Sequence, residues 1–358
     1  MRILPCVLAV ALGVAGAWAD EPSGAMVELS LRGRTIEGVP LSWNRQEVRL
    51  LGRDGRLWRF PPQEAVDFKK TSDRFQSYPL SEFRAVLLRE LGQDYEVSGT
   101  DRYLVAHPKG QRDRWAQRFE DLYRSFVRYF SVRGFALSSP PCPLVGVVCA
   151  DRSEFARLAA AQTGLSTAGV QGYYDLASNR IALYDMGGRS ESGSWQQNAS
   201  VLIHEAAHQT AFNTGVHNRF APPPVWVAEG LAMLFEAPGV YDPHNHPRPE
   251  DRVNRRRLEE FRRRVAPRHR PESLVALVAS DAPFQADTLS AYAEAWALSF
   301  FLAETEPRRY ADYLKRTAGR PNFSTYASAE RLADFKAVFG GDWRMLEARL
   351  LKFLGGFQ

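Results

Sequence analysis

The stretch NASVLIHEAAHQTAFN, residues 198–213, decides the fold of this chain. Small and apolar residues flank its polar ones, a pattern typical of a helix that is buried in a core. His204 and His208 stand four residues apart, so they project from one face of that helix. Two imidazoles at this spacing can bind one zinc ion, and Glu205 then lies where it can take a proton from a metal-bound water.

A second motif, WVAEGLA at residues 226–232, supplies a carboxylate. It follows the helix-stopping run APPP at residues 221–224, so Glu229 belongs to a new helix, with 20 residues between His208 and Glu229. A carboxylate among Val, Ala, Leu and Met is costly to bury unless it is paired or binds a metal. Two histidines and one carboxylate leave a fourth position for water, which is typical of catalytic zinc. The sequence therefore predicts Zn²⁺ held by His204, His208 and Glu229.

These motifs resemble those of the gluzincin metallopeptidases, the thermolysin-like branch of the peptidase-MA superfamily. Within that group the chain most resembles an uncharacterised exported bacterial family with a peptidase-MA-like domain. The resemblance covers roughly residues 95–314. Three stretches carry it: GYYDLASNRIALYD at 172–185, LIHEAAHQ at 202–209 and WVAEGLA at 226–232.

The resemblance implies a zincin-like fold and hydrolysis of peptide bonds in a protein or peptide substrate. It implies His204, His208 and Glu229 as zinc ligands, with Glu205 as the general base that accepts the water proton and returns it to the leaving amine. Thermolysin carries an acidic residue four positions after its glutamate ligand, and that residue orients a histidine. This chain has Met233 at that position. A group that orients a histidine must therefore come from elsewhere.

Three tyrosines are further candidates by the same resemblance. Several gluzincins supply a tyrosine that binds the oxyanion from a helix beyond the glutamate ligand, and Tyr292 in AYAEAWALSFFL fits that position. An ordinary packed aromatic is an equally favoured interpretation of Tyr292. Tyr173 and Tyr174 belong to a hairpin strand that borders the active cleft in such proteins and can hold an extended substrate by strand addition. They are expected either to line the cleft or to be structural.

The N-terminus predicts an export signal. After Met1 and Arg2, a nearly all-apolar run extends to Gly16, and residues 17–19 (AWA) form an A-x-A cleavage site. The run is shorter than the ~18–20 apolar residues that a transmembrane helix requires. We therefore expect residues 1–19 to be a signal peptide and the protein to be periplasmic or extracellular. An uncleaved anchor is the less favoured alternative.

Removal of the signal leaves Cys142 and Cys149 as the only cysteines, and an oxidising compartment favours pairing. Their spacing argues against a disulfide, because LVGVV at residues 144–148 is typical of a buried strand. Such a strand separates the two sulfurs by roughly 23 Å, whereas bridged Cα atoms lie within about 7 Å of each other. We expect both thiols to be free.

The net charge of +5 comes largely from arginines, many of them at residues 252–270. Acidic residues are interleaved with them and apolar residues recur at helical spacing, which favours a solvated helix face over a nucleic-acid or membrane surface. No nucleic-acid partner is expected for an exported chain. His217, His244 and His246 lie in polar or Pro-flanked stretches and are predicted to be solvated loop histidines. A second metal site at residues 242–246 is the alternative.

The pattern divides the chain into a small β module and a larger domain. With 358 residues and 45% apolar content, it can bury a sizeable core. From residue 26 to about residue 70, short alternating runs broken by turn residues predict four or five antiparallel strands. We assign them to a small barrel or sandwich over residues 20–75, with a structural role or a role in docking an envelope partner. Residues 80–358 are expected to form the zincin-like domain, in which a mixed sheet precedes a mainly helical half, an α+β arrangement.

The elements expected in the larger domain follow from periodicity and turn residues. They are strands at YEVSG, RYLVAHP and LVGVV, a hairpin over 172–184, and helices over 112–132, 152–162, 198–213, 225–236, 249–265, 286–304 and 307–317, with two more after Ser328.

The predicted function is zinc-dependent hydrolysis of peptide bonds. An alternative from another class is a non-catalytic envelope binding module in which the zinc site is structural. Glu205 argues against that alternative, because a pseudoenzyme commonly loses the glutamate between the histidines. A third hypothesis is an enzyme that acts only on its own chain or within an assembly.

Overall fold

The computed structural model describes residues 24–111, 115–164, 169–186 and 194–357. The signal peptide predicted at residues 1–19 lies outside the described residues. No helix in the described ranges combines the length and the apolar character that crossing a membrane would need.

The N-terminal part of the described chain is one antiparallel sheet with the order β4-β3-β2-β1-β5. Its strands are β1 (Met26–Leu31), β2 (Arg34–Trp43), β3 (Val48–Gly52), β4 (Leu57–Phe60) and β5 (Ala65–Ser72). Alternate residues, among them Leu29, Leu50 and Phe60, face a separate apolar cluster. The expectation of four or five short strands is confirmed. In the described residues β4 and β5 are edge strands, so hydrogen bonding does not close this sheet into a barrel.

A second, mixed sheet has the order β6-β7-β8-β10-β9. Its strands are β6 (Tyr95–Gly99), β7 (Tyr103–Pro108), β8 (Leu144–Cys149), β9 (Gly172–Asp175) and β10 (Arg180–Tyr184). The three central strands run parallel, while β6 and β9 are antiparallel edges. Every residue of β8 is buried, as expected of a parallel strand with both faces covered. The strand pair, the buried strand and the hairpin that the sequence predicts are all confirmed.

Four helices cover the two faces of this sheet. Val148 and Ile181 pack on one face with residues of α2 (Ala116–Ser131) and α4 (Ser194–Asn213). Their strand neighbours Val147 and Ala182 pack on the other face with residues of α1 (Leu80–Leu91) and α3 (Arg152–Thr163). The alternation follows from the two-residue period of a strand. Helix α1 is not among the elements expected from the sequence. Only Phe83 of its first turn and Leu87 are fully buried.

The C-terminal half is helical and shares one large apolar core. Helix α5 (Val225–Phe235) crosses α10 (Thr288–Thr305) at Gly230, where a Cβ would lie 2.1 Å from the Ser299 hydroxyl oxygen. Only glycine permits this approach. The other helices are α6 (Pro238–Tyr241), α7 (Arg255–Glu260), α8 (Pro271–Ala279), α9 (Ala282–Ala286), α11 (Pro307–Ala318), α12 (Ser328–Phe339) and α13 (Trp343–Gly355).

The single helix predicted over residues 249–265 is wrong in detail. The segment begins with a short 3-10 helix at Pro249–Arg252, and α7 starts anew after Asn254. The Asn254 side chain accepts a hydrogen bond from the backbone N–H of Arg257 at 3.2 Å, which caps the new helix. A π-helical turn at Phe261–Val265 follows.

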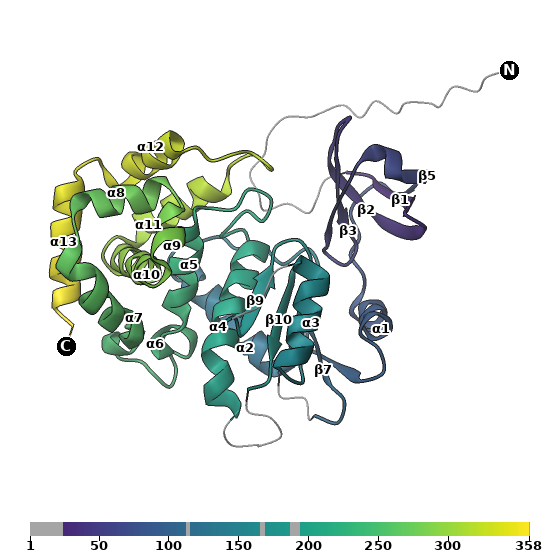
Figure 1. The fold of residues 1–358 in the computed structure, drawn as a ribbon, viewed down its shortest axis with the longest axis horizontal. Helices are drawn as coiled ribbons and strands as arrows, with labels where there is room; N and C mark the ends of the chain where they lie inside the picture. The colour runs from purple at the N-terminus through teal and green to yellow at the C-terminus, as the bar shows by residue number, and fades with distance from the viewer. Residues whose placement is uncertain (1–23, 112–114, 165–168, 187–193, 358) are drawn as a thin grey trace.

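Figure 1 shows the β1–β5 sheet at one end of the molecule and the helices of the C-terminal half at the other, with the mixed sheet between them. Arg180 on β10, 2% exposed, joins the mixed sheet to the small sheet. Its Nη1 donates to Glu90 of α1 at 2.8 Å, and its Nη2 lies 3.7 Å from Asp54 in the turn between β3 and β4. The backbone N–H of Leu57 also donates to the carbonyl of Ala177, at 2.7 Å. The small sheet therefore contacts the turn of the β9–β10 hairpin.

Cys142 and Cys149 are both buried and free, which confirms the expectation that they do not pair. Burial raises the pKa of each thiol to about 12. Neither cysteine has the accessible thiolate that reactivity requires.

Candidate metal centre

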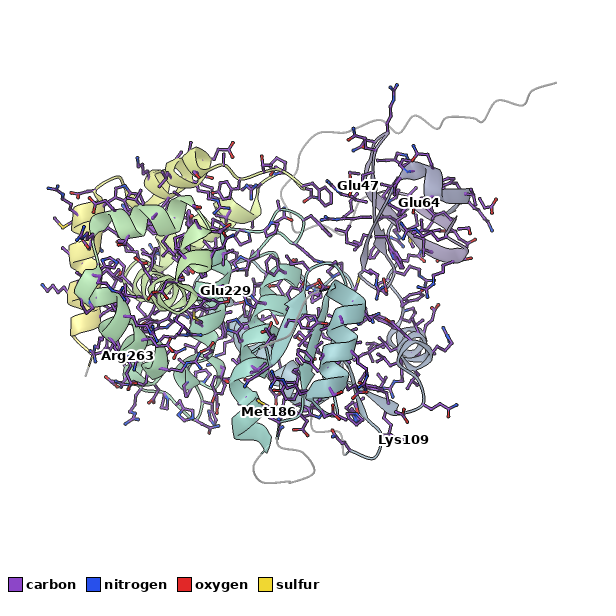
Figure 2. All side chains as sticks on the ribbon, viewed as in Figure 1. Glu47, Glu64, Lys109, Met186, Glu229 and Arg263 are labelled. Atoms are coloured by element: carbon purple, nitrogen blue, oxygen red, sulfur yellow. The ribbon has the colours of Figure 1, made fainter. Side chains whose placement is uncertain are left out.

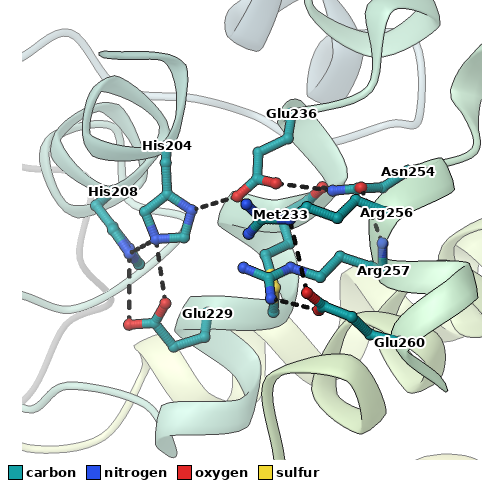
Figure 3. Close-up of polar contacts among 9 residues, drawn as sticks. All are labelled: His204, His208, Glu229, Met233, Glu236, Asn254, Arg256, Arg257 and Glu260. Atoms are coloured by element: carbon teal, nitrogen blue, oxygen red, sulfur yellow. Dashed lines mark hydrogen bonds and ion pairs between the residues drawn. The ribbon is translucent and has the colours of Figure 1, made fainter. Parts of the chain in front are cut away.

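Helices α4 and α5 bring three side chains together in the interior. His204 and His208 lie one turn apart on α4, and their Nε2 atoms are 3.1 Å from each other. Glu229 on α5 places its Oε2 atom 3.1 Å from Nε2 of His204 and its Oε1 atom 3.5 Å from Nε2 of His208. Figure 3 shows the three side chains converging, and Figure 2 places Glu229 between the mixed sheet and the C-terminal helices. Among the described residues, no other group of three His, Cys, Asp or Glu side chains has ligand atoms so close.

The spacing of these atoms fits a tetrahedral zinc ion. Ligand atoms at ~2.0–2.1 Å from a tetrahedral metal lie roughly 3.3 Å from one another, close to the three distances of 3.1, 3.1 and 3.5 Å. Two imidazole nitrogens that face each other at 3.1 Å also need a cation or a shared proton between them. The donor set of two imidazoles and one carboxylate is the set that zinc prefers at catalytic sites.

Glu236 orients His204. Its Oε1 atom lies 2.9 Å from Nδ1 of His204, so the Nδ1–H donates to the carboxylate and the Nε2 lone pair is left to face Glu229. The other Glu236 oxygen accepts a hydrogen bond from Asn254 at 2.8 Å. The buried Met233 cannot provide this contact. Glu236 thus takes over the orienting role for which the sequence showed no residue, from a position seven residues after Glu229, two turns along the same helix face.

The electrostatics of the site favour a charged Glu229. Burial tends to raise the pKa of Glu229, but His208 and His204 outweigh it, and the pKa falls well below its usual range. The pKa of Glu205, in contrast, is raised. Burial raises it by more than the charges of His204 and His208 lower it. A hydrogen bond with the backbone of Tyr174 also lowers the pKa of Glu205. This contact ties the carboxylate to strand β9.

A cavity of about 220 Å³ opens beside His204, the one of the three side chains that lines it. His204 and Glu205 line it from α4, and the segment that leads into β9, Gly169–Gly172, lines it from the mixed sheet. Glu236 adds a wall at the end of α5. The remaining lining residues are Ser200, Val201, Arg256, Arg257 and Tyr292.

Tyr292 on α10 borders the same cavity as Glu205. Burial raises the pKa of its hydroxyl, and the nearby carboxylates of Glu229 and Glu205 raise it further, so the phenol keeps its proton. Its ring packs edge-on against Phe284, with ring centroids 5.5 Å apart. The structure thus brings Tyr292 to the predicted site as a hydroxyl donor, and also shows it as a packed aromatic. Its catalytic role stays a prediction.

The side chains of Tyr173 and Tyr174 point to opposite faces of the sheet. Tyr173 packs on Phe155, and its hydroxyl donates to Gln162 at 3.2 Å. Tyr174 stacks on Phe212, and its hydroxyl donates to Asn179 at 2.7 Å. Neither side chain lines the cavity. A contact between these residues and a substrate would therefore involve the backbone of β9, and that role stays a prediction.

The prediction that His217 is solvated is wrong. It is only 2% exposed, and burial lowers its pKa to about 3. Within the described part of the chain its Nε2 atom has no hydrogen-bond partner. The ring packs against Phe212 after the end of α4, with centroids 5.1 Å apart. The polar residues around it in sequence gave no sign of this burial. His244 is exposed, as predicted, and among the described residues no metal-binding group includes residues 242–246.

The arginine-rich segment departs from the expected solvated face at one point. Most of its arginines are exposed, but Arg257 is only 6% exposed. Its Nη1 donates to Glu260 at 2.8 Å, and its Cζ lies 5.4 Å from the centroid of the Tyr292 ring. Arg257 therefore belongs to the cavity wall.

Comparisons with known proteins give one partial family match. A family model described as "Protein of unknown function (DUF1570)" matches residues 198–324, a stretch that contains all the candidate residues except Tyr173 and Tyr174. No curated protein sequence matches the chain.

Solved structures with a distant likeness include zinc metallopeptidases. One is the M1 zinc metallopeptidase from Deinococcus radiodurans, with 13% identity, a TM-score of 0.39, and coverage of 70% of this chain and 48% of that chain. Another is a mutant of it bound to a Tyr-Ser-Ala substrate, with 13% identity, a TM-score of 0.40, and coverage of 72% of this chain and 51% of that chain. The chain spans about half the length of these structures.

Proposed function

We propose that this protein is a zinc-dependent peptidase of the zincin type. The observation that carries the proposal is the convergence of His204, His208 and Glu229, with His204 lining a cavity that Glu205 and Tyr292 also line. The three side chains would hold the zinc ion. Residues of the types that peptide hydrolysis needs, a general base and a hydroxyl donor, are thus next to one open site.

A zinc ion held there would supply Lewis-acid polarisation of a carbonyl and would lower the pKa of water. Glu205 accepts the proton of the attacking water and delivers it to the leaving amine nitrogen. Tyr292 donates its hydroxyl to the oxyanion that forms on the scissile carbonyl. Glu236 keeps the His204 ring in place through the 2.9 Å hydrogen bond at Nδ1.

The substrate would be a protein or peptide in extended conformation. Strand β9 is an edge of the mixed sheet in the described residues, and its backbone contacts Glu205 through Tyr174. An extended peptide can add to such an edge by main-chain hydrogen bonds. Because the sequence predicts an export signal, we propose that cleavage takes place in the periplasm or outside the cell, and that the β1–β5 module docks an envelope partner.

The alternative, a binding module with a structural zinc, shares the metal site but needs neither Glu205 nor an accessible cavity. A combined measurement of metal content and cleavage separates the two functions. The wild-type chain from residue 20 should contain about one zinc per chain and should cleave members of a mixed peptide library. Removal of the metal by a chelator should abolish cleavage, and added zinc should restore it. Full zinc content without any cleavage would favour the binding module, and absence of zinc would refute both.

A further inference from the structure

Arg257 is an unusual residue for a cavity wall, because arginine side chains are seldom buried. It is 6% exposed, and Glu260 on the next turn of α7 holds its Nη1 at 2.8 Å. The buried Nε atom has no hydrogen-bond partner among the residues that the structure describes. In Figure 3 the side chain extends from α7 toward α5, the helix of Glu229. A buried guanidinium with an unused donor at a cavity is prepared for an acceptor from outside the chain.

Arg256 and Arg257 form the part of the cavity wall that α7 contributes, here called the α7 wall. This wall carries an excess of positive charge. Arg256 also lines the cavity, and its Nε lies 3.8 Å from the same Glu260 carboxylate. Two guanidinium groups therefore share one carboxylate. The acidic residues of the cavity stand on other elements: Glu205 is on α4, and Glu236 at the end of α5 is held by His204 and Asn254.

The position of Arg257 places this charge next to the reacting groups. Its Cζ lies 5.4 Å from the centroid of the Tyr292 ring, and both side chains line the cavity together with Glu205. Contact with an aromatic face fixes the plane of a guanidinium. A planar fork of N–H donors fits a carboxylate, which accepts two parallel hydrogen bonds.

We propose that Arg257, assisted by Arg256, makes the cavity selective for a carboxylate of the substrate. The inference rests on the proposed peptidase function and adds a specificity to it. This carboxylate can be the free C-terminus of a peptide or the side chain of an Asp or Glu near the scissile bond, and both groups have the same chemistry. In the first case the protein trims C-termini, and in the second it cleaves within acidic sequences.

Matched peptides separate these sources. One pair differs only in a C-terminal acid or amide, and a second pair, amidated at the C-terminus, differs only in an internal Glu or Gln. Each is tested for kcat/KM with the wild-type holoenzyme and for affinity, by fluorescence anisotropy, with the zinc-loaded Glu205→Gln protein. In one of the two pairs, kcat/KM and affinity should both be about tenfold higher for the acid peptide than for its neutral partner, as expected for a charge-assisted hydrogen bond.

Variants assign the preference to the α7 wall. The preference is the ratio of kcat/KM for the acid and neutral members of a pair. Arg257→Gln should abolish this preference, Arg257→Lys should keep part of it, and Arg256→Gln should reduce it less than Arg257→Gln does. Arg263→Gln, an exposed position away from the cavity, is the matched control. Zinc content and thermal unfolding of each variant identify a folding defect, and Arg256→Gln tests the wall at an exposed residue in that case.

The possible outcomes separate this inference from the proposed function. Preferential binding of an acid peptide without any cleavage would contradict the peptidase function and support the carboxylate site. Equal kcat/KM and equal affinity for the acid and neutral members of both pairs, measured with Arg256 and Arg257 intact, would overturn the inference even where cleavage occurs. An equal loss for acid and neutral peptides in Arg257→Gln, or the same change in Arg263→Gln, would also overturn it.

Discussion

Nδ1 of His204 lies 2.9 Å from Oε1 of Glu236, so a carboxylate two helical turns after Glu229 fixes the orientation of the first histidine. Such partners of a ligating histidine tune its affinity for the metal. Glu236→Ala should therefore weaken zinc binding about 10- to 100-fold while the fold is retained. Competition with a chromophoric chelator measures the affinity. Exposed Glu259→Ala is the control, and a zinc affinity unchanged in Glu236→Ala would refute this role.

Tyr292→Phe removes a hydroxyl that borders the cavity without removing the ring that packs on Phe284. If this hydroxyl binds the oxyanion, kcat should fall about a hundredfold, with KM and zinc content nearly unchanged. Steady-state kinetics on a cleaved peptide provides the measurement. Tyr241→Phe, a half-buried tyrosine outside the cavity, should leave kcat unaltered. An unaltered kcat in Tyr292→Phe would leave Tyr292 only its packing role.

Gly230 follows Glu229 at the crossing of α5 and α10. An added Cβ would lie 2.1 Å from the Ser299 hydroxyl oxygen and 2.6 Å from the Ala295 carbonyl oxygen, and a backbone carbonyl cannot move aside alone. Gly230→Ala should therefore destabilise the protein by about 2 kcal/mol through overpacking. Denaturant unfolding of the variant measures the loss. Gly341→Ala, whose Cβ would meet only a lysine side-chain atom at 3.9 Å, is the matched control. Equal stability of the two variants would contradict the tight crossing.

His269 should make the stability of the helical half depend on pH. Its Nδ1 lies 2.8 Å from Glu347 on α13 and its Nε2 lies 3.0 Å from Glu294 on α10, with the ring fully buried. Burial lowers its pKa, but the two carboxylates outweigh burial and raise it. Because the pKa of His269 is higher in the folded protein than the unfolded value of ~6.5, protonated His269 stabilises the fold fully below that value. This stabilisation is lost as the pH rises through the folded pKa.

His269→Gln should thus cost most stability at mildly acidic pH, and its difference from wild type should shrink as the pH rises. Urea unfolding is measured between about pH 5.5 and 9. This window lies above the ordinary pKa values of carboxylates and extends to both sides of the unfolded histidine pKa. The exposed His244→Gln should show no such trend. A difference that stays constant across the window would show that the charge of His269 contributes nothing.

Much of the fold could be predicted from local pattern. The all-buried strand β8 appears as the apolar run LVGVV, and α4 and α5 appear as apolar segments bounded by turn or proline residues. The convergence of His208 and Glu229 could be anticipated because a buried carboxylate requires a partner. These features depend on residues that are close in sequence or on the cost of burying charge.

The features that could not be predicted depend on contacts between distant elements. Glu236 lies next to His204 only because α5 crosses α4, and no spacing between positions 204 and 236 encodes that contact. Arg257 looked like its exposed neighbours, since a triple-arginine run gives no sign of which member points inward. The burial of His217 depends in the same way on packing after the end of α4, which polar flanking residues conceal.

The central claim is that Glu205 acts as a base beside a zinc ion held by His204, His208 and Glu229. The most direct test is peptide cleavage by wild type and Glu205→Gln at equal, measured zinc content. We predict about one zinc per chain in both proteins and loss of cleavage in the variant alone, by at least about a hundredfold. Cleavage by Glu205→Gln at the wild-type rate, with the zinc still bound, would contradict the account.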